Sequence, residues 1–164
     1  MKLLFLGDSI TEGVGAFAPE KNYVNLVARK LDCEVLNYGV SGTRIARRKK
    51  RSEPLSFDWD FVSRATVMER EADLIFVFGG TNDYGHGDAE IGEKGSFDPY
   101  TFCGSVNALI SYLVSSYGKE KLCFILPLRR YDEVGIRRKS LEEFVDILRA
   151  AVKEKKSIGG KVKL

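Results

Sequence analysis

The stretch KLLFLGDS, at residues 2–9, decides the fold. After its lysine the stretch is apolar as far as Leu6, and it then changes abruptly to Gly7-Asp8-Ser9. An apolar run of this length is typical of a strand buried on both faces of a parallel sheet. The change to glycine and small polar residues indicates a tight turn at the end of that strand. The sequence therefore predicts a buried strand whose end presents a serine.

Strand-like and helix-like segments alternate along the rest of the chain. Three more apolar runs predict strands buried on both faces: Cys33–Tyr38, Leu74–Phe78 and Leu122–Leu126. Apolar residues at helical spacing predict two helices, at 23–31 and 102–117, and a capping box at Ser140 to Glu143 starts a third. This alternation predicts an α/β sandwich with a parallel sheet and right-handed crossovers. A weak last strand is expected near Val162.

Length and composition exclude several classes of protein. With 164 residues, 44% of them hydrophobic and 30% charged, the chain fits a single globular domain over residues 1–164. Its net charge of +3 indicates no nucleic-acid partner. The longest uncharged stretch, 99–118, is too polar to span a bilayer, and no signal peptide is recognisable, so we expect a cytoplasmic protein without a membrane partner. The three cysteines are widely spaced, which predicts buried free thiols.

Small and polar residues follow three of the predicted strands. They form the loops Gly7–Gly13, Asn37–Gly42 and Gly79–Asp83. In an open parallel sheet such loops meet at the carboxyl edge, where ligands bind. Ser9 at this edge is a candidate nucleophile, and the Gly39 N–H and the Asn82 amide are suitable donors to a developing oxyanion. Together these residues predict an acyl-transfer site that acts on a small-molecule ester.

Turn chemistry offers a separate explanation for each of these residues. Ser9 or Thr11 would be a helix N-cap. Gly39 and Gly42 would permit a positive φ. The Asn82 side chain would form an Asx turn, in which it hydrogen-bonds to the backbone of its own turn. Each explanation suffices alone. Their coincidence at three strand ends favours a functional site.

The three loops resemble the sequence blocks of the SGNH hydrolases, also called the GDSL family of esterases and lipases. Gly7-Asp8-Ser9 is similar to the first block, Gly39 to the glycine of the second and Asn82 to the asparagine of the third. The resemblance implies a three-layer α/β/α sandwich with a flavodoxin-like sheet of order 2-1-3-4-5, its last strand weak or missing here. It also implies that Ser9 attacks a small acyl or O-acetyl ester, that the Ser9 and Gly39 N–H groups and the Asn82 amide bind the oxyanion, and that no metal or organic cofactor takes part.

The sequence departs from the family at its last block. The family takes its general base from an Asp-x-x-His block near the C-terminus, which is missing here, so we expect a C-terminally short domain with reduced esterase activity. The only histidine, His86, stands at that spacing from Asp83, but in the third loop. His86 is thus a candidate base, and an exposed loop histidine or a contact at the substrate's edge is the alternative. A catalytically inactive binding or partner protein of the same fold is the alternative function.

Further residues lie beside the three loops. We expect Asp8 and Arg44 to contact the substrate. The basic run Arg47–Arg51 is expected to be a solvated loop, because no aromatic residues interleave with it as in nucleic-acid surfaces. Three aromatic residues near the acyl pocket are expected to fill the core or the rim: Phe17, Phe97 and Tyr100. A short C-terminus would leave part of the sheet uncovered, which makes a homo-oligomer an expectation as well.

Overall fold

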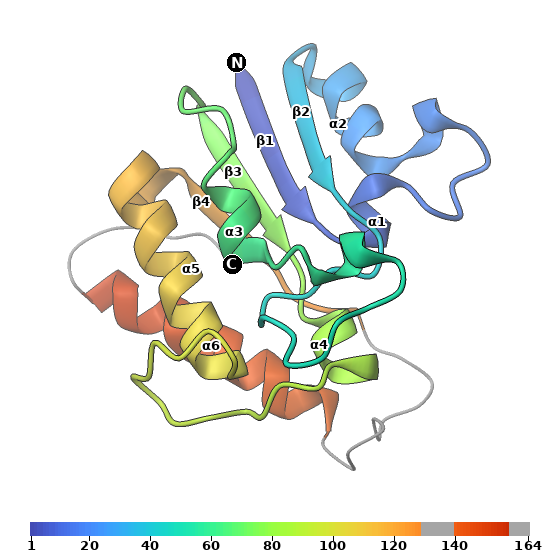
Figure 1. The fold of residues 1–164 in the computed structure, drawn as a ribbon. Helices are drawn as coiled ribbons and strands as arrows, with labels where there is room; N and C mark the ends of the chain where they lie inside the picture. Colours follow the sequence, from blue (N-terminus) through green and yellow to red (C-terminus); the bar gives the residue numbers. More distant parts are fainter. Residues whose placement is uncertain (129–139, 158–164) are drawn as a thin grey trace.

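The structure, a computed structural model, describes residues 1–128 and 140–157 (Figure 1). Its centre is a sheet of four parallel strands in the order β2-β1-β3-β4. The strands are β1 (Lys2–Gly7), β2 (Glu34–Gly39), β3 (Leu74–Phe78) and β4 (Leu122–Ile125). The predicted parallel α/β fold is therefore confirmed over its first four strands. The last strand expected near Val162 lies outside the described residues.

Helices cover both faces of this sheet, which gives three layers (Figure 1). On one face α2 (Tyr23–Leu31) packs through Val24 against Leu3 and Phe5 of β1. Leu4 and Leu6 of β1 face the other way, into the main core. Four helices contribute to that core: α3 (Phe61–Ala65), α4 (Thr81–His86) through Tyr84, α5 (Phe102–Tyr117) and α6 (Leu141–Ser157). β1 is thus buried on both faces, as predicted.

Two features differ from the sequence predictions. β2 is not buried on both faces, because it is an edge strand, and Glu34 and Asn37 are exposed. The chain also contains three short helices that were not predicted, α1 (Ser9–Glu12), α3 and α4 (Thr81–His86), since one or two turns give no periodic pattern. Three single 3₁₀ turns complete the described elements: η1 (Pro19–Lys21), η2 (Leu55–Asp58) and η3 (Lys119–Lys121).

The strand register brings the three polar loops to one edge of the sheet. Gly7, the last residue of β1, pairs with Gly39 of β2 and with Phe78 of β3. Three adjacent strands therefore end level with one another. α1, the loop after β2 and α4 all begin at this edge (Figure 1).

Three further expectations concern membrane spans, cysteines and metal sites. None of the described helices is long and apolar enough to cross a membrane. The three cysteines form no disulfide; Cys103 is buried, whereas Cys33 and Cys123 are only half-buried, which corrects the expectation of three buried thiols. Within residues 1–128 and 140–157, no group of three or more histidine, cysteine or acidic residues is arranged to hold a metal ion.

Candidate active site

Ser9 is the first residue of α1, directly after the turn that ends β1. The side chain of Asp8 caps this helix by accepting a hydrogen bond from the Ile10 N–H at 3.0 Å, so the interpretation of Ser9 as the N-cap is wrong. The turn is tight, because a Cβ atom at Gly7 would overlap the Thr11 side chain. Ser9 is half-buried, and its hydroxyl makes no hydrogen bond to any residue that the structure describes. Turn chemistry therefore does not account for this hydroxyl.

Gly39 lies against the backbone of α1. A Cβ atom there would overlap the backbone of Thr11 and Glu12, so only glycine allows this packing. Its φ is not positive, unlike the +72° of Gly42, so the positive-φ explanation is wrong for Gly39 and confirmed for Gly42. The Gly39 N–H donates to Asn37 Oδ1 at 2.8 Å, and Asn37 Nδ2 donates to the Thr11 carbonyl at 2.7 Å. Asn37, which sequence analysis did not select, thus ties β2 to α1.

Asn82 lies in the first turn of α4, after Gly80, whose φ is +103°. Asn82 Nδ2 donates to the carbonyl oxygen of Thr43 at 2.9 Å, and Asn82 Oδ1 lies 3.1 Å from Nε2 of His86. The second ring nitrogen of His86, Nδ1, lies 2.8 Å from Nη2 of Arg44. The Asn82 side chain therefore bonds to the loop after β2 and to His86, and the interpretation as an Asx turn is wrong.

Asp83 fixes the loop after β2 against α4. Its buried carboxylate accepts hydrogen bonds from the Ile45 N–H at 3.0 Å and from the Ala46 N–H at 2.9 Å. Burial raises the pKa of Asp83 from 3.8 to about 6, although these two bonds and the charge of Arg44 lower it. Sequence analysis considered Asp83 only for its spacing from His86, because contacts with residues nearly 40 positions away leave no local pattern.

Arg64 of α3 joins the ends of β1 and β2. Its guanidinium donates to the carbonyl oxygens of Gly7 at 3.0 Å, Tyr38 at 2.5 Å and Trp59 at 3.1 Å, and to the Thr43 hydroxyl at 2.8 Å. Burial lowers the pKa of Arg64 to about 10, although nearby carboxylates raise it. Sequence analysis missed this residue, which lies 57 positions from Gly7. Arg64 holds together the strand ends on which Ser9 and Gly39 depend.

The two residues predicted to contact substrate are buried. Asp8 and Arg44 are each only 2% exposed, so neither presents its charge to solvent. Burial raises the pKa of Asp8, and its cap hydrogen bond and the charge of Arg64 act against this. Burial also lowers the pKa of Arg44, with repulsion from Arg48 adding to the effect. Substrate contact stays a prediction for both, and the contacts observed are those of a helix cap and of a partner for His86.

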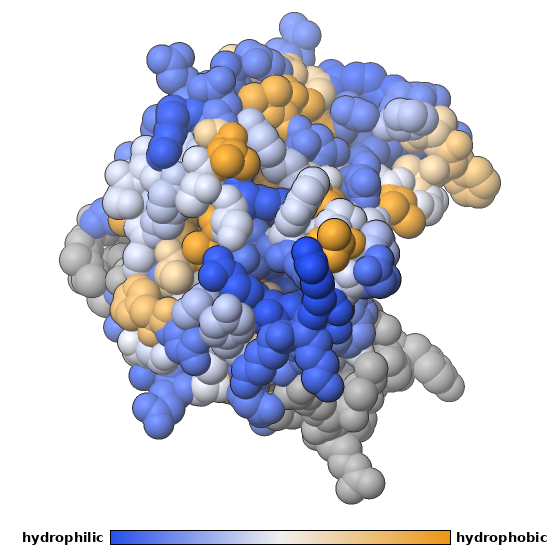
Figure 2. All heavy atoms as spheres, viewed as in Figure 1, coloured by the Kyte–Doolittle hydropathy of each residue, from blue (hydrophilic) through white to orange (hydrophobic). Residues whose placement is uncertain are grey.

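The three aromatic residues that were expected beside an acyl pocket do not lie in the core. Phe17, Phe97 and Tyr100 are 97%, 58% and 41% exposed, so core filling is wrong for all three, and a place at the rim of the site stays a prediction. The view in Figure 2 shows hydrophobic residues scattered over a largely hydrophilic face. No aromatic side chain among these three forms a buried acyl slot.

The basic run Arg47–Arg51 lines an open surface hollow of about 430 Å³ together with Asp58, Asp60 and Ser63. Arg47 is paired with Asp60 at 3.1 Å. The backbone N–H groups of Lys49 and Lys50 donate to one carboxylate oxygen of Asp88, at 3.2 and 3.0 Å. Carboxylates thus anchor the loop and offset part of its charge, which agrees with the expected solvated loop.

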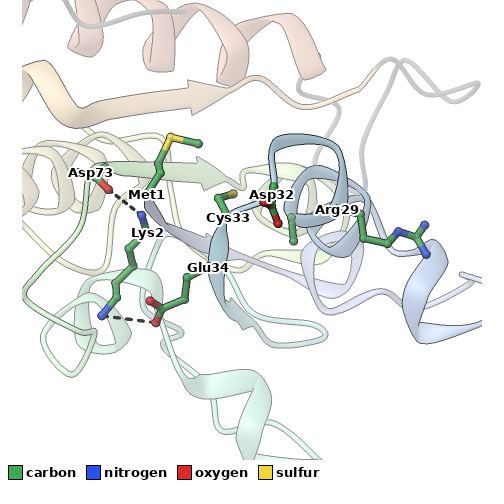
Figure 3. Close-up of a pocket in the computed structure, with 8 residues that line it drawn as sticks. Met1, Lys2, Arg29, Asp32, Cys33, Glu34 and Asp73 are labelled. Atoms are coloured by element: carbon green, nitrogen blue, oxygen red, sulfur yellow. Dashed lines mark hydrogen bonds and ion pairs between the residues drawn. The ribbon is translucent and has the colours of Figure 1, made fainter.

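A second open hollow, of about 620 Å³, lies at the opposite end of the sheet (Figure 3). It surrounds the start of β1, where Lys2 donates through its backbone to Asp73 at 2.7 Å and pairs through Nζ with Glu34 at 3.5 Å. Parallel α/β sheets bind ligands at the other edge, where the strands end. This hollow is therefore separate from the candidate active site.

The fold and the three loops at its carboxyl edge define an α/β protein of the kind that binds ligands where parallel strands end. The chain belongs to the GDSL-like lipase/acylhydrolase family, whose sequence pattern it matches over residues 5–160. This confirms the resemblance that the three loops indicated. A search of curated proteins found no match to the chain.

Solved structures with the same fold include several bacterial proteins. A protein from Lactobacillus plantarum is 23% identical with a TM-score of 0.76, over 99% of this chain and 76% of that one. A possible lipase from Chitinophaga pinensis is 21% identical with a TM-score of 0.70, over 94% and 65% of the two chains. The lipase/acylhydrolase from Enterococcus faecalis is 22% identical with a TM-score of 0.65, over 94% and 72%. At these identities the comparison shows the shared fold.

Proposed function

We propose that the chain is a serine ester hydrolase with Ser9 as its nucleophile. The observation that carries the proposal is the level ending of β1, β2 and β3, which brings the loops of Ser9, Gly39 and Asn82 to one edge. Membership of a lipase/acylhydrolase family supports it. The Ser9 hydroxyl is compatible with this role, because it makes no hydrogen bond to any described residue and is half-exposed, which leaves it accessible to a substrate.

In the proposed reaction Ser9 Oγ attacks the carbonyl carbon of a small acyl or O-acetyl ester. The hydroxyl proton passes to His86 or to solvent water, and the N–H groups of Ser9 and Gly39 and the Asn82 amide stabilise the oxyanion that forms on the carbonyl oxygen. The bond to the alcohol oxygen then breaks, the alcohol takes up the proton, and an acyl-serine remains. Water attacks the acyl group by the same route, which releases the carboxylic acid and restores Ser9. These steps balance without a cofactor.

Asn37 competes with the substrate for one of the proposed donors. The Gly39 N–H donates to Asn37 Oδ1 at 2.8 Å, and the Asn37 side chain is exposed. An oxyanion is a stronger hydrogen-bond acceptor than a neutral amide oxygen. We therefore expect the substrate oxygen to displace or share this bond as negative charge develops on it.

His86 is the candidate base because it is the only histidine in the sequence. Nδ1 is engaged with Arg44 and Nε2 with Asn82, so the ring would have to release one of them before accepting the Ser9 proton. We therefore propose a low esterase activity. While the ring stays engaged, the oxyanion donors and substrate binding alone are expected to accelerate hydrolysis by roughly 10³ to 10⁴ over water, as in serine hydrolases without a working base.

Labelling and turnover of the full chain test this function. A fluorophosphonate is expected to label Ser9 slowly, as seen by intact mass and peptide mapping, and p-nitrophenyl acetate to be turned over. Ser9→Ala should abolish both, whereas Ser115→Ala, at an exposed serine of α5, should change neither. Equal turnover by the parent and Ser9→Ala would remove Ser9 from the mechanism.

The alternative is a binding or partner protein of the same fold without activity. The engagement of the Gly39 N–H and of both His86 nitrogens favours this alternative. A folded protein that takes no label at Ser9 and releases no nitrophenol above background would support it against the hydrolase.

A further inference from the structure

We infer that Arg44 and His86 are positioning residues that fix the orientation of the Asn82 side-chain amide. The inference rests on the proposed function, in which this amide is an oxyanion donor. A chain of contacts carries it: Arg44 Nη2 lies 2.8 Å from His86 Nδ1, and His86 Nε2 lies 3.1 Å from Asn82 Oδ1. Asn82 Nδ2 ends the chain by donating to the Thr43 carbonyl oxygen at 2.9 Å.

The chemistry of the two end groups, the Arg44 guanidinium and the Thr43 carbonyl, decides the direction of every bond in this chain. A guanidinium has only donors, so Nδ1 of His86 must accept and carries no proton. The proton of the neutral ring then sits on Nε2, which must donate to its partner on Asn82. That partner is therefore the amide oxygen, and the amide nitrogen faces the Thr43 carbonyl. Arg44 at one end and the acceptor-only Thr43 carbonyl at the other therefore require the same His86 tautomer and the same Asn82 orientation.

The opposite orientation of the amide is unfavourable at both ends. It would place Asn82 Oδ1 against the Thr43 carbonyl oxygen and Asn82 Nδ2 against the Nε2–H of His86, so two hydrogen bonds would become two repulsive contacts. In the observed orientation Nδ2 uses one proton for Thr43 and keeps the second for an oxyanion. The bond accepted by Oδ1 also polarises the amide, which strengthens its N–H groups as donors.

The surroundings make this chain of contacts rigid. Arg44 is 2% exposed, which restricts its side chain to few rotamers. Its neighbours on both sides are tied to α4, since the Thr43 carbonyl accepts from Asn82 and the Ile45 N–H donates to Asp83. Arg44 thus lies between two cross-links to the helix that carries His86 and Asn82. An oxyanion donor must be held in place before the reaction, and such a frame does this.

The sole histidine allows a direct test that does not depend on activity. In ¹⁵N NMR at about pH 8, where an ordinary imidazole is neutral, the ring signals of the full chain belong to His86 alone. We expect one fully populated tautomer with the proton on Nε2 and none on Nδ1. Arg44→Met, and to a lesser degree Arg44→Lys, should admit a fraction of the tautomer with the proton on Nδ1, because only the Thr43 carbonyl then opposes it. Arg70→Met, at an exposed arginine that donates to Ser116, should leave the ring signals unchanged. A single unchanged tautomer in Arg44→Met would show that Thr43 alone fixes the amide and would overturn the role of Arg44. A proton on Nδ1, or averaged tautomers in the parent, would overturn the inference.

Kinetics then separate positioning from base catalysis. Loss of one oxyanion donor lowers kcat roughly 10²- to 10³-fold. The fall in kcat of Asn82→Ala is therefore the largest that misplacing the Asn82 amide can cause. His86→Ala should lower kcat by about tenfold or more at nearly constant KM, and should have no further effect in the Asn82→Ala background. His86→Gln keeps an N–H donor for Asn82 but cannot act as a base, so it should retain most of the parent's kcat. A base would give equal losses in His86→Gln and His86→Ala and the same loss in both backgrounds.

Different results contradict the proposed function and the positioning role. If Ser9→Ala turns over ester as fast as the parent, the proposed function fails, and the NMR signals still decide whether Arg44 orders His86. If Ser9 is the nucleophile but His86→Ala and Asn82→Ala losses multiply independently, the positioning role fails alone.

Discussion

Replacing Arg64 by methionine removes the side chain that bonds to the ends of both β1 and β2. In the parent its guanidinium donates to three carbonyl oxygens, of Gly7, Tyr38 and Trp59, and to the Thr43 hydroxyl. Methionine fills most of the same volume but donates nothing. The variant therefore leaves these oxygens without their donor while it preserves the packing of α3.

The expected loss in the free energy of unfolding of Arg64→Met follows from two opposing effects. Hydrogen bonds to charged groups contribute about 1.5 to 3 kcal/mol each, so the four bonds together contribute roughly 6 kcal/mol even at the lower limit. Burial of the cation acts against them: the pKa of Arg64 falls from 12.5 to about 10, which corresponds to ~3 kcal/mol against the charged form. We therefore expect Arg64→Met to lower the free energy of unfolding by ~3 kcal/mol, a large part of the ~5 to 15 kcal/mol typical of a domain.

Urea denaturation followed by far-ultraviolet circular dichroism measures this loss. Arg70→Met is the matched control, because Arg70 is exposed and donates to the Ser116 hydroxyl at 3.1 Å; it should change the free energy of unfolding by less than about 1 kcal/mol. Labelling of Ser9 should also slow in Arg64→Met, since the ends of β1 and β2 lose their common anchor. If Arg64→Met is as stable as Arg70→Met, the reasoning is refuted. Water molecules would then replace the hydrogen bonds of Arg64 to the carbonyl oxygens at no cost in stability.

Three further predictions concern the edge of the sheet. Gly39→Ala should lower the free energy of unfolding by about 2 kcal/mol or more and stop Ser9 labelling, because the new Cβ overlaps the backbone of α1; parent-like urea denaturation would contradict this. Asp8→Ala removes the N-cap of α1 and should cost about 1 kcal/mol in the same assay. Because the folded-state pKa of Asp83 is raised from 3.8 to about 6, its contribution to stability is full below about pH 4 and lost as the pH rises to about 6. The stability of Asp83→Asn relative to the parent should therefore increase by up to ~3 kcal/mol between pH 4 and pH 7, and a constant difference would contradict the raised pKa.

The sequence predicts those parts of the fold that depend on local pattern. β1, β3 and β4 lie where the apolar runs place them, and α2, α5 and α6 follow helical spacing. β2 was placed correctly, but its half-exposed character depends on its position at the sheet edge, which its own residues do not encode. The short helix α4 was missed for a related reason, since six residues are too few for a periodic signal.

The contacts that hold the candidate site together could not be predicted in the same way. Arg64 reaches Gly7 across 57 positions, and Arg44 reaches His86 across 42. In the sequence Arg44 is one cation near a basic run, which suggested contact with the substrate, whereas folding buries its side chain. Long-range contacts of this kind are set by topology and by which groups remain to satisfy buried polar atoms.

The local explanations for the three motif residues fail for three different physical reasons. Asp8 occupies the cap position, so the Ser9 hydroxyl is not needed to cap α1. Gly39 is required by the close approach of α1 and not by its φ, so a steric reason accounts for it whether or not its N–H binds an oxyanion. Asn82 has two side-chain bonds, and Nδ2 retains one proton beyond them. Gly39 thus gives the weakest support for catalysis and Ser9 the strongest, because a hydroxyl left without a structural role at a ligand-binding edge is what a nucleophile requires.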